Sequence, residues 1–193
     1  MKVYKFKNYD EYVASQKEAN EEKQHMSFVQ LKTIKKIFDV YGPNAKNILC
    51  HGTRRGAEQK YFKHVYPNAE IIGTEIGISD WPMTVQHDFA IPKKEWIGYF
   101  DIVYSNSFDH SFDPDKTMTT WIEQLANNGK MFIDWNHDQN TGIPHESDPC
   151  SGSVKDFERF LIKHKLSFTK PPLRENIFGR DIFSGLYEIT KQR

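Results

Sequence analysis

The sequence has few cysteines, no surplus of either charge and no long hydrophobic run. Only two cysteines, Cys50 and Cys150, occur among 193 residues, which argues against a disulfide scaffold. Acidic and basic residues number 26 each, so the net charge argues against a generic nucleic-acid binder or a polybasic membrane-surface protein. No run approaches about 18 apolar residues, and residues 1–9 lack a signal-peptide core. We therefore expect a single-domain cytoplasmic protein that does not enter the membrane.

The N-terminal and C-terminal parts of the sequence differ in their pattern of apolar and polar residues. Residues 1–44 predict two helices that cover the domain, and residues 45–193 predict an α/β core. Asp10 is a candidate cap for the first helix, and Ser27 with Gln30 matches a capping box for the second. In the core, apolar strands alternate with helices, which is typical of a mainly parallel sheet with helices on both faces. We predict a three-layer Rossmann-like fold.

The predicted elements are bounded by turn residues. Strands are expected at 47–50, 69–75, 84–89, 100–104, 130–135, 166–169 and 182–190. Helices are expected at about 10–24, 28–38, 57–66, 114–126 and after Ser153, with Asn127-Asn128-Gly129 ending the fourth.

A glycine turn joins the first core strand to the next helix. Gly52 and Gly56 lie in this turn, and Glu75 ends the following strand. Small residues let the backbone approach a ligand, and a strand-end carboxylate can accept both ribose hydroxyls. The glycines also fit a plain tight turn, but the acid downstream favours a nucleoside site. The Gly-x-Gly-x-x-Gly pattern of nicotinamide sites is missing.

This order of parts resembles the class I S-adenosylmethionine-dependent methyltransferases over roughly residues 47–190. Their first strand ends in acid-x-Gly-x-Gly-x-Gly, and the corresponding positions here are Cys50, Gly52, Arg54 and Gly56. The leading acid and the middle glycine are therefore missing. The resemblance implies S-adenosylmethionine as cofactor. It also implies a seven-stranded, mainly parallel sheet with an antiparallel C-terminal hairpin strand.

The same resemblance implies a cofactor site at the carboxyl ends of the strands. Glu75 corresponds to the ribose-binding acid and Asp88 to the residue near the adenine amine, although Asp88 fits a turn cap equally well. We predict that the Arg54 guanidinium pairs with the methionine carboxylate. Ile76 and Trp81 are candidates to sandwich the adenine, although Trp81 also fits surface packing. The expected cofactor residues are Gly52, Thr53, Arg54, Gly56, Glu75, Ile76, Asp88, Phe89 and Ser105.

Polar residues after the fourth and fifth core strands are the catalytic candidates, namely His110, His137, Asp109 and Asn106. Either histidine could be a general base for a hydroxyl acceptor, although each alone is more often a bonded loop residue. Metal-assisted methyltransferases hold magnesium in the region of Asp109, Asp134 and Asn136. Turn capping is the favoured interpretation there. The histidines also lack zinc-site spacing, so we expect no metal.

The methyl acceptor is not specified by the sequence. We expect the N-terminal helices and the loop 136–152 to cover the substrate side, and neither carries a basic run, which favours a small molecule or glycan over nucleic acid. The turn 105–109 lacks the motif of amino-group DNA methyltransferases. A non-catalytic domain that binds the cofactor or only a partner is the alternative, supported by Cys50 and Arg54. A nicotinamide-dependent oxidoreductase is a third hypothesis.

Overall fold

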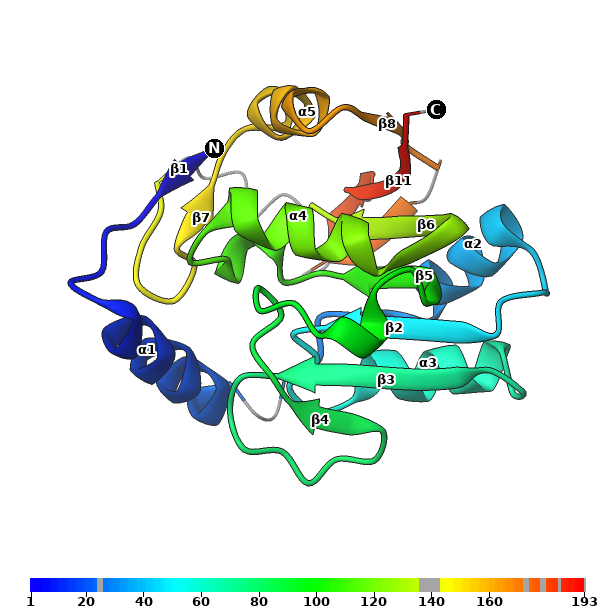
Figure 1. Cartoon of the computed structure of the whole chain (residues 1–193), viewed down its shortest axis with the longest axis horizontal. Helices are drawn as coiled ribbons and strands as arrows, with labels where there is room; N and C mark the ends of the chain where they lie inside the picture. Colours follow the sequence, from blue (N-terminus) through cyan, green and yellow to red (C-terminus); the bar gives the residue numbers. More distant parts are fainter. Residues whose placement is uncertain (24–25, 136–142, 172–173, 178–179, 184, 193) are drawn as a thin grey trace.

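The computed structural model describes residues 1–23, 26–135, 143–171, 174–177, 180–183 and 185–192. Its central sheet has seven strands in the order β4-β3-β2-β5-β6-β11-β8 (Figure 1). Their bounds are β2 Asn47–His51, β3 Glu70–Glu75, β4 Thr84–Gln86, β5 Phe100–Ser105, β6 Leu125–Asp134, β8 Leu166–Thr169 and β11 Leu186–Lys191. Strand β11 runs antiparallel to β6 and β8, and the other neighbours are parallel. The predicted α/β fold with an antiparallel C-terminal strand is confirmed.

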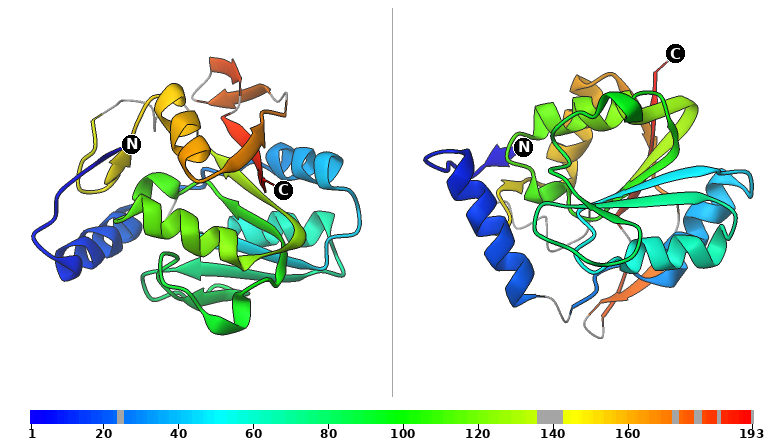
Figure 2. Two further views of the ribbon diagram at one scale, coloured as in Figure 1. Left: turned by 45° about the horizontal axis from the view of Figure 1, so that its top comes forward. Right: turned by 60° about the horizontal axis from the view of Figure 1, so that its bottom comes forward.

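Helices cover both faces of this sheet, and Figure 2 shows the layers from two further sides. Their bounds are α1 Tyr9–Glu22, α2 Leu31–Tyr41, α3 Ala57–Val65, α4 Pro114–Gln124 and α5 Val154–Lys163. Buried residues of α2 and α3, such as Ile34 and Phe62, form one apolar core. Trp121 of α4 and Phe157 of α5 belong to the core on the other face. Helix α1 lies apart from both layers, near the carboxyl end of β3 (Figure 1).

Two helix caps differ from the prediction. Asn8, with an extended backbone, caps α1 by accepting a hydrogen bond from the Glu11 amide at 2.9 Å. Asp10 therefore lies in the first turn, where its charge suits the helix dipole. Helix α2 begins after Gln30 without a side-chain cap, so the capping box predicted at Ser27 does not form. The cap of α5 at Ser153 is confirmed.

The predicted stop after α4 is wrong. Residues 127–129 lie inside β6, which follows α4 directly. Glycine fits at Gly129 because a Cβ there would lie 2.6 Å from the Phe100 carbonyl oxygen. The strand pairing shifts between Phe100 and Ile102, so an irregularity in the ladder accommodates this polar stretch.

Short elements complete the fold. Strand β1, Lys2–Val3, pairs with β7, Cys150–Ser151, and this pairing ties the N-terminus to the segment before α5. The predicted strand 182–190 divides into β10, Arg180–Phe183, which pairs with β9, Arg174–Ile177, and β11. The part of the chain that the structure describes includes the 3-10 turns η1 at Lys94–Trp96 and η2 at Phe108–His110. Within the described residues, no helix is both long and apolar enough to span a membrane.

Candidate functional site

The backbone conformation of the turn between β2 and α3 accounts for its two glycines. Gly52 and Gly56 both have φ of +68°, a region that side chains disfavour. A Cβ on Gly52 would also lie 2.7 Å from the Ser107 Cβ. Arg54, between them, has φ of +42°. The turn alone therefore requires glycine at Gly52 and favours it at Gly56, whatever ligand it approaches.

Glu75 ends β3 with its carboxylate buried, at 5% relative exposure. It accepts hydrogen bonds from the backbone amides of Arg54, at 2.8 Å, and Gly77, at 3.1 Å. The Asn20 side-chain amide of α1 donates a third. Burial raises the pKa of Glu75, although the Gly77 and Arg54 amides act in the opposite direction. Three protein donors thus hold a carboxylate that faces the pocket.

Asp88 follows β4 and has two partners. Its Oδ1 accepts a hydrogen bond from the Ala90 amide at 2.7 Å, so the turn-capping role is confirmed. Its Oδ2 accepts a hydrogen bond from the Tyr9 hydroxyl of α1. Helix α1 therefore contacts both predicted cofactor acids.

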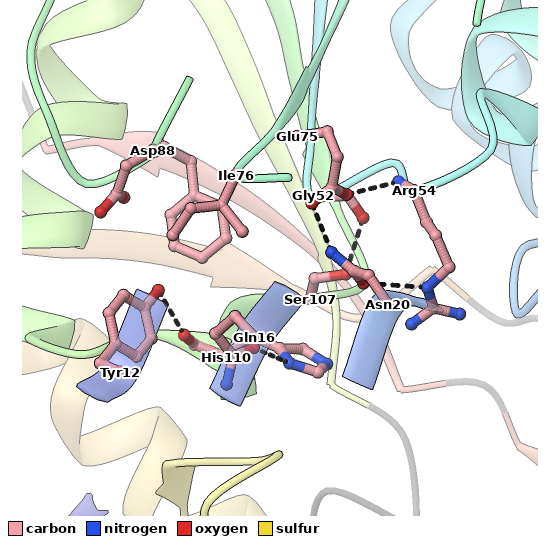
Figure 3. Close-up of a pocket in the computed structure, with 11 residues that line it drawn as sticks. Tyr12, Gln16, Asn20, Gly52, Arg54, Glu75, Ile76, Asp88, Ser107 and His110 are labelled. Atoms are coloured by element: carbon pink, nitrogen blue, oxygen red, sulfur yellow. Dashed lines mark hydrogen bonds between the residues drawn. The ribbon is translucent and has the colours of Figure 1, made fainter. Parts of the chain in front are cut away.

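A pocket lies between the strand ends and α1 (Figure 3). We call its two sides the strand wall and the helix wall. The strand wall consists of Gly52, Arg54, Glu75, Ile76, Asp88, Phe89, Ser107 and His110. The helix wall consists of Tyr12, Gln16 and Asn20.

His110 lies on the η2 turn after β5 and is held by α1. Its Nδ1 lies 2.8 Å from Gln16 Oε1, and its carbonyl accepts a hydrogen bond from the Tyr12 hydroxyl at 3.0 Å. Burial lowers the pKa of His110 to about 4, although the Asp148 carboxylate raises it. The imidazole is therefore neutral near pH 7.

Arg54 bridges the two walls. Its Nε donates to Asn20 Oδ1 at 3.0 Å, and its Nη1 donates to the Lys23 carbonyl at 3.4 Å. The guanidinium carbon also lies 5.4 Å from the centre of the Phe28 ring. The pairing of Arg54 with a methionine carboxylate stays a prediction.

Glu58 lies behind the strand wall, in the first turn of α3. It is buried, at 5% relative exposure. Burial raises the pKa of Glu58 to about 7, although a hydrogen bond from Asn106 and the charge of Arg54 lower it. Asn106, predicted as catalytic, therefore has a buried carboxylate as its partner and lines a small neighbouring cavity with Thr53 and Glu58.

Comparisons with known proteins identify the fold. No protein-family model and no curated protein sequence matches the chain. Among solved structures, it is similar to the Burkholderia thailandensis 1,6-didemethyltoxoflavin-N1-methyltransferase with bound S-adenosylhomocysteine. The TM-score is 0.72 at 14% identity, over 96% of this chain and 91% of that one. The chain has the methyltransferase fold.

Two further structures agree with that fold. The plantazolicin methyltransferase BpumL, in complex with S-adenosylhomocysteine, has a TM-score of 0.63 at 14% identity, over 93% of this chain and 89% of that one. The sugar N-methyltransferase KedS8 from Streptoalloteichus sp ATCC 53650 has a TM-score of 0.62 at 12% identity, over 100% of this chain and 97% of that one. At such identities the likeness concerns the class I methyltransferase fold.

On this methyltransferase fold, seven of the predicted residues meet in one pocket, namely Gly52, Arg54, Glu75, Ile76, Asp88, Phe89 and His110. Ser105 is buried, and its hydroxyl donates to the His51 carbonyl at 3.1 Å. Gly56 and Trp81 line an outer groove, so Trp81 is not placed to sandwich an adenine with Ile76. Asp109 is buried next to His110. His137 and Asn136 lie outside the described residues.

The N-terminal helices were expected on the substrate side, but Ser107 and the individual residues of the helix wall were not among the predicted site residues. Tyr12, Gln16 and Asn20 recur every four residues on a helix that is otherwise mostly charged, which places them on one face. This spacing of residues able to form hydrogen bonds was the available signal. No pattern within α1 identified the strand ends as the surface that this face contacts.

Proposed function

We propose that this protein is an S-adenosylmethionine-dependent methyltransferase that acts on a small molecule or glycan in the cytoplasm. The observation that carries the proposal is the buried Glu75 carboxylate. Glu75 ends β3 of a methyltransferase-type sheet, and its carboxylate faces the pocket. Solved structures with the same fold hold S-adenosylhomocysteine, the demethylated product of this cofactor. The net charge of zero disfavours nucleic acid as the acceptor.

In this proposal the strand wall, apart from His110, binds the cofactor. The Glu75 carboxylate would accept hydrogen bonds from the ribose hydroxyls, and the Asp88 carboxylate would accept one from the adenine amine. Ile76 and Phe89 supply apolar contact to the base. Arg54 pairs with the methionine carboxylate, with Gly52 and Thr53 beside it. The cofactor must displace Asn20 and Tyr9 from these acids, so part of α1 moves when it binds.

Methyl transfer is an in-line displacement, in which the protein aligns the acceptor atom with the methyl group and the leaving sulfur. His110 lies across the pocket from Glu75, Ile76 and Asp88 (Figure 3). We assign the acceptor to that side, next to Tyr12, Gln16 and His110. Asp109 lies next to His110 on this side, whereas Asn106 lies in the neighbouring cavity with Glu58.

A non-catalytic binding domain is the second candidate. It is favoured by one observation: Tyr9 and Asn20 already hold the two carboxylates that the cofactor would use. Methyl transfer from S-adenosylmethionine to a panel of amines, hydroxyl compounds and glycans separates the candidates. Cofactor binding without transfer to any acceptor would favour the non-catalytic domain.

Calorimetric titration with S-adenosylmethionine, S-adenosylhomocysteine and NADH tests the cofactor. We expect the first two to bind and NADH to fail. In Glu75→Gln, S-adenosylmethionine should bind roughly 30-fold more weakly, because two hydrogen bonds to a charged acceptor weaken by about 1 kcal/mol each. Glu70→Gln is the matched control, since Glu70 lies at the exposed start of the same strand. Equal losses in the two variants would contradict the assignment.

A further inference from the structure

A cluster of possible metal ligands lies beside the pocket. Asp109, His110 and Asp148 each direct one donor atom toward the others, and these atoms all lie within 4.8 Å of one another. His110 Nε2 is 3.8 Å from Asp109 Oδ1 and 3.6 Å from Asp148 Oδ1. The first two residues belong to the η2 turn, whereas Asp148 comes from the segment before β7. The fold therefore brings together donors that are distant in sequence.

Gln16 of α1 decides which nitrogen of His110 carries the proton. The Gln16 side-chain nitrogen donates to two carbonyls, of Glu146 at 3.1 Å and of Ser147 at 3.4 Å. These contacts fix the amide orientation, so the oxygen of Gln16 faces His110 Nδ1 at 2.8 Å. An amide oxygen only accepts hydrogen bonds, and Nδ1 must therefore be the protonated nitrogen. The lone pair of Nε2 then points toward the two carboxylates.

One possible metal-donor atom of each of the three residues thus converges on the same point. The separations of 3.6 and 3.8 Å are too long for hydrogen bonds from Nε2. Two atoms that share an ion at about 2.0–2.2 Å lie roughly 3–4.4 Å apart, so the same separations suit metal ligands. Asp109 is also buried, at 5% relative exposure.

We propose that Asp109, His110 and Asp148 bind one divalent first-row metal ion such as Mn²⁺ or Zn²⁺. Two carboxylates and one imidazole match the preferences of these ions better than those of Ca²⁺. This assignment replaces the expectation that the site lacks a metal, and it makes His110 a ligand in place of a general base.

The surroundings of the cluster fit that role. A metal-bound histidine usually donates its second N–H to an oxygen, as His110 does to Gln16. His145 Nε2 lies 3.0 Å from the second oxygen of Asp148, and His145 Nδ1 lies 3.1 Å from the Ser147 hydroxyl. Gln16 thus orients the His110 ring, and His145 orients the Asp148 carboxylate. Three protein ligands leave coordination positions for water or for an oxygen of an acceptor.

Binding of Mn²⁺ to the full chain, followed by electron paramagnetic resonance of the free ion, tests the proposal without cofactor or turnover. We expect one bound Mn²⁺ per chain, displaced by Zn²⁺. His110→Ala and Asp148→Asn should weaken binding by more than about 100-fold, and Gln16→Leu by about 10–100-fold as an outer partner. His64→Ala, which removes an exposed histidine of α3, should bind as the wild type does.

Circular dichroism and melting curves establish that each variant is folded. If His110→Ala fails to fold, Asp148→Asn decides, because the Asp148 side chain is 36% exposed and its loss opens no core cavity. Failure of the wild type to bind Mn²⁺ or Zn²⁺ at millimolar concentration would overturn the proposal. Unchanged affinity in Asp148→Asn would do the same. Neither result depends on S-adenosylmethionine, so the proposed methyltransferase function is judged separately.

Discussion

The strand wall of the pocket continues directly from the core, whereas the helix wall contacts it mainly through hydrogen bonds. Strands β2, β3 and β5 are almost wholly buried before they reach the pocket. Helix α1 buries only Tyr12, Gln16 and Ala19. Both walls thus present polar groups to the pocket, but the strands of one wall are buried in the core and the helix of the other is mostly not.

The helix wall is itself uneven. At its N-terminal half, Tyr12 packs on Phe6 and Phe112, with ring centres 5.6 and 5.1 Å apart. Towards its C-terminus, Gln16 and Asn20 contact the pocket by hydrogen bonds. Segments with few apolar contacts open at low free-energy cost. We infer that the C-terminal half of α1 moves for a ligand, together with the Tyr9 side chain that bonds Asp88, while the strand wall stays fixed.

The largest effect is expected behind the strand wall, at Glu58. Its folded-state pKa is raised from 4.5 to about 7 by burial. Below pH 4.5 the Glu58 carboxyl is mostly protonated in both the folded and the unfolded protein. As pH rises from 4.5 to 7, the unfolded state ionises first, so stability falls, and the full cost is present above pH 7. Glu58→Gln removes this cost and should raise the free energy of unfolding at pH 8 by about 3 kcal/mol, at 1.36 kcal/mol per pKa unit.

Urea denaturation at pH 4.5 and pH 8 measures this difference. The wild type should lose stability between the two pH values relative to Glu58→Gln. Glu18→Gln, at an exposed position of α1, should leave the wild-type pH dependence unchanged. If the free energy of unfolding changed with pH equally in the wild type and in Glu58→Gln, burial would not raise the pKa of Glu58, and the prediction would be wrong.

A smaller effect is expected at Arg54, which joins the two walls. Arg54→Ala should bind S-adenosylmethionine about 10-fold more weakly in calorimetry, because a charge-assisted pair with the methionine carboxylate is lost. Arg54→Lys should recover part of this affinity, since it keeps the charge and loses the planar fork. Arg55→Ala is the control, because the Arg55 guanidinium lies over Trp81, 5.4 Å from its ring centre. Affinity equal to the wild type in Arg54→Ala would refute the role.

The fold could be predicted because its signals are local. Apolar runs such as 100–104 and the glycine turn at Gly52 specify strands and their connections, and α/β alternation then limits the topology. The residues 127–129 misled the prediction, since Asn and Gly normally end helices and strands. A register irregularity beside Phe100 lets this stretch stay in β6, and such an irregularity depends on the neighbouring strand.

The strand wall of the site could be predicted for the same reason. Parallel strands deliver their carboxyl ends to one edge, so Glu75, Asp88 and His110 meet there. The N-terminal helices and the loop 136–152 were expected on the substrate side. The individual contacts of α1 and Asp148 could not be predicted, because they join segments that no local pattern relates. Gln16 illustrates this limit, since its role follows from two carbonyls more than a hundred residues away.

The smallest effect, at Asn20, tests whether the helix wall competes with the cofactor. Asn20 donates to Glu75, and this hydrogen bond must break before ribose hydroxyls can replace it. Asn20→Ala should therefore bind S-adenosylmethionine about 5-fold more tightly, since a hydrogen bond contributes about 1 kcal/mol net. Amide hydrogen exchange in the C-terminal half of α1 should become faster. Glu21→Ala, on the exposed face of the same helix, controls for helix propensity. Weaker cofactor binding in Asn20→Ala would mean instead that the helix wall closes over the bound cofactor and contacts it.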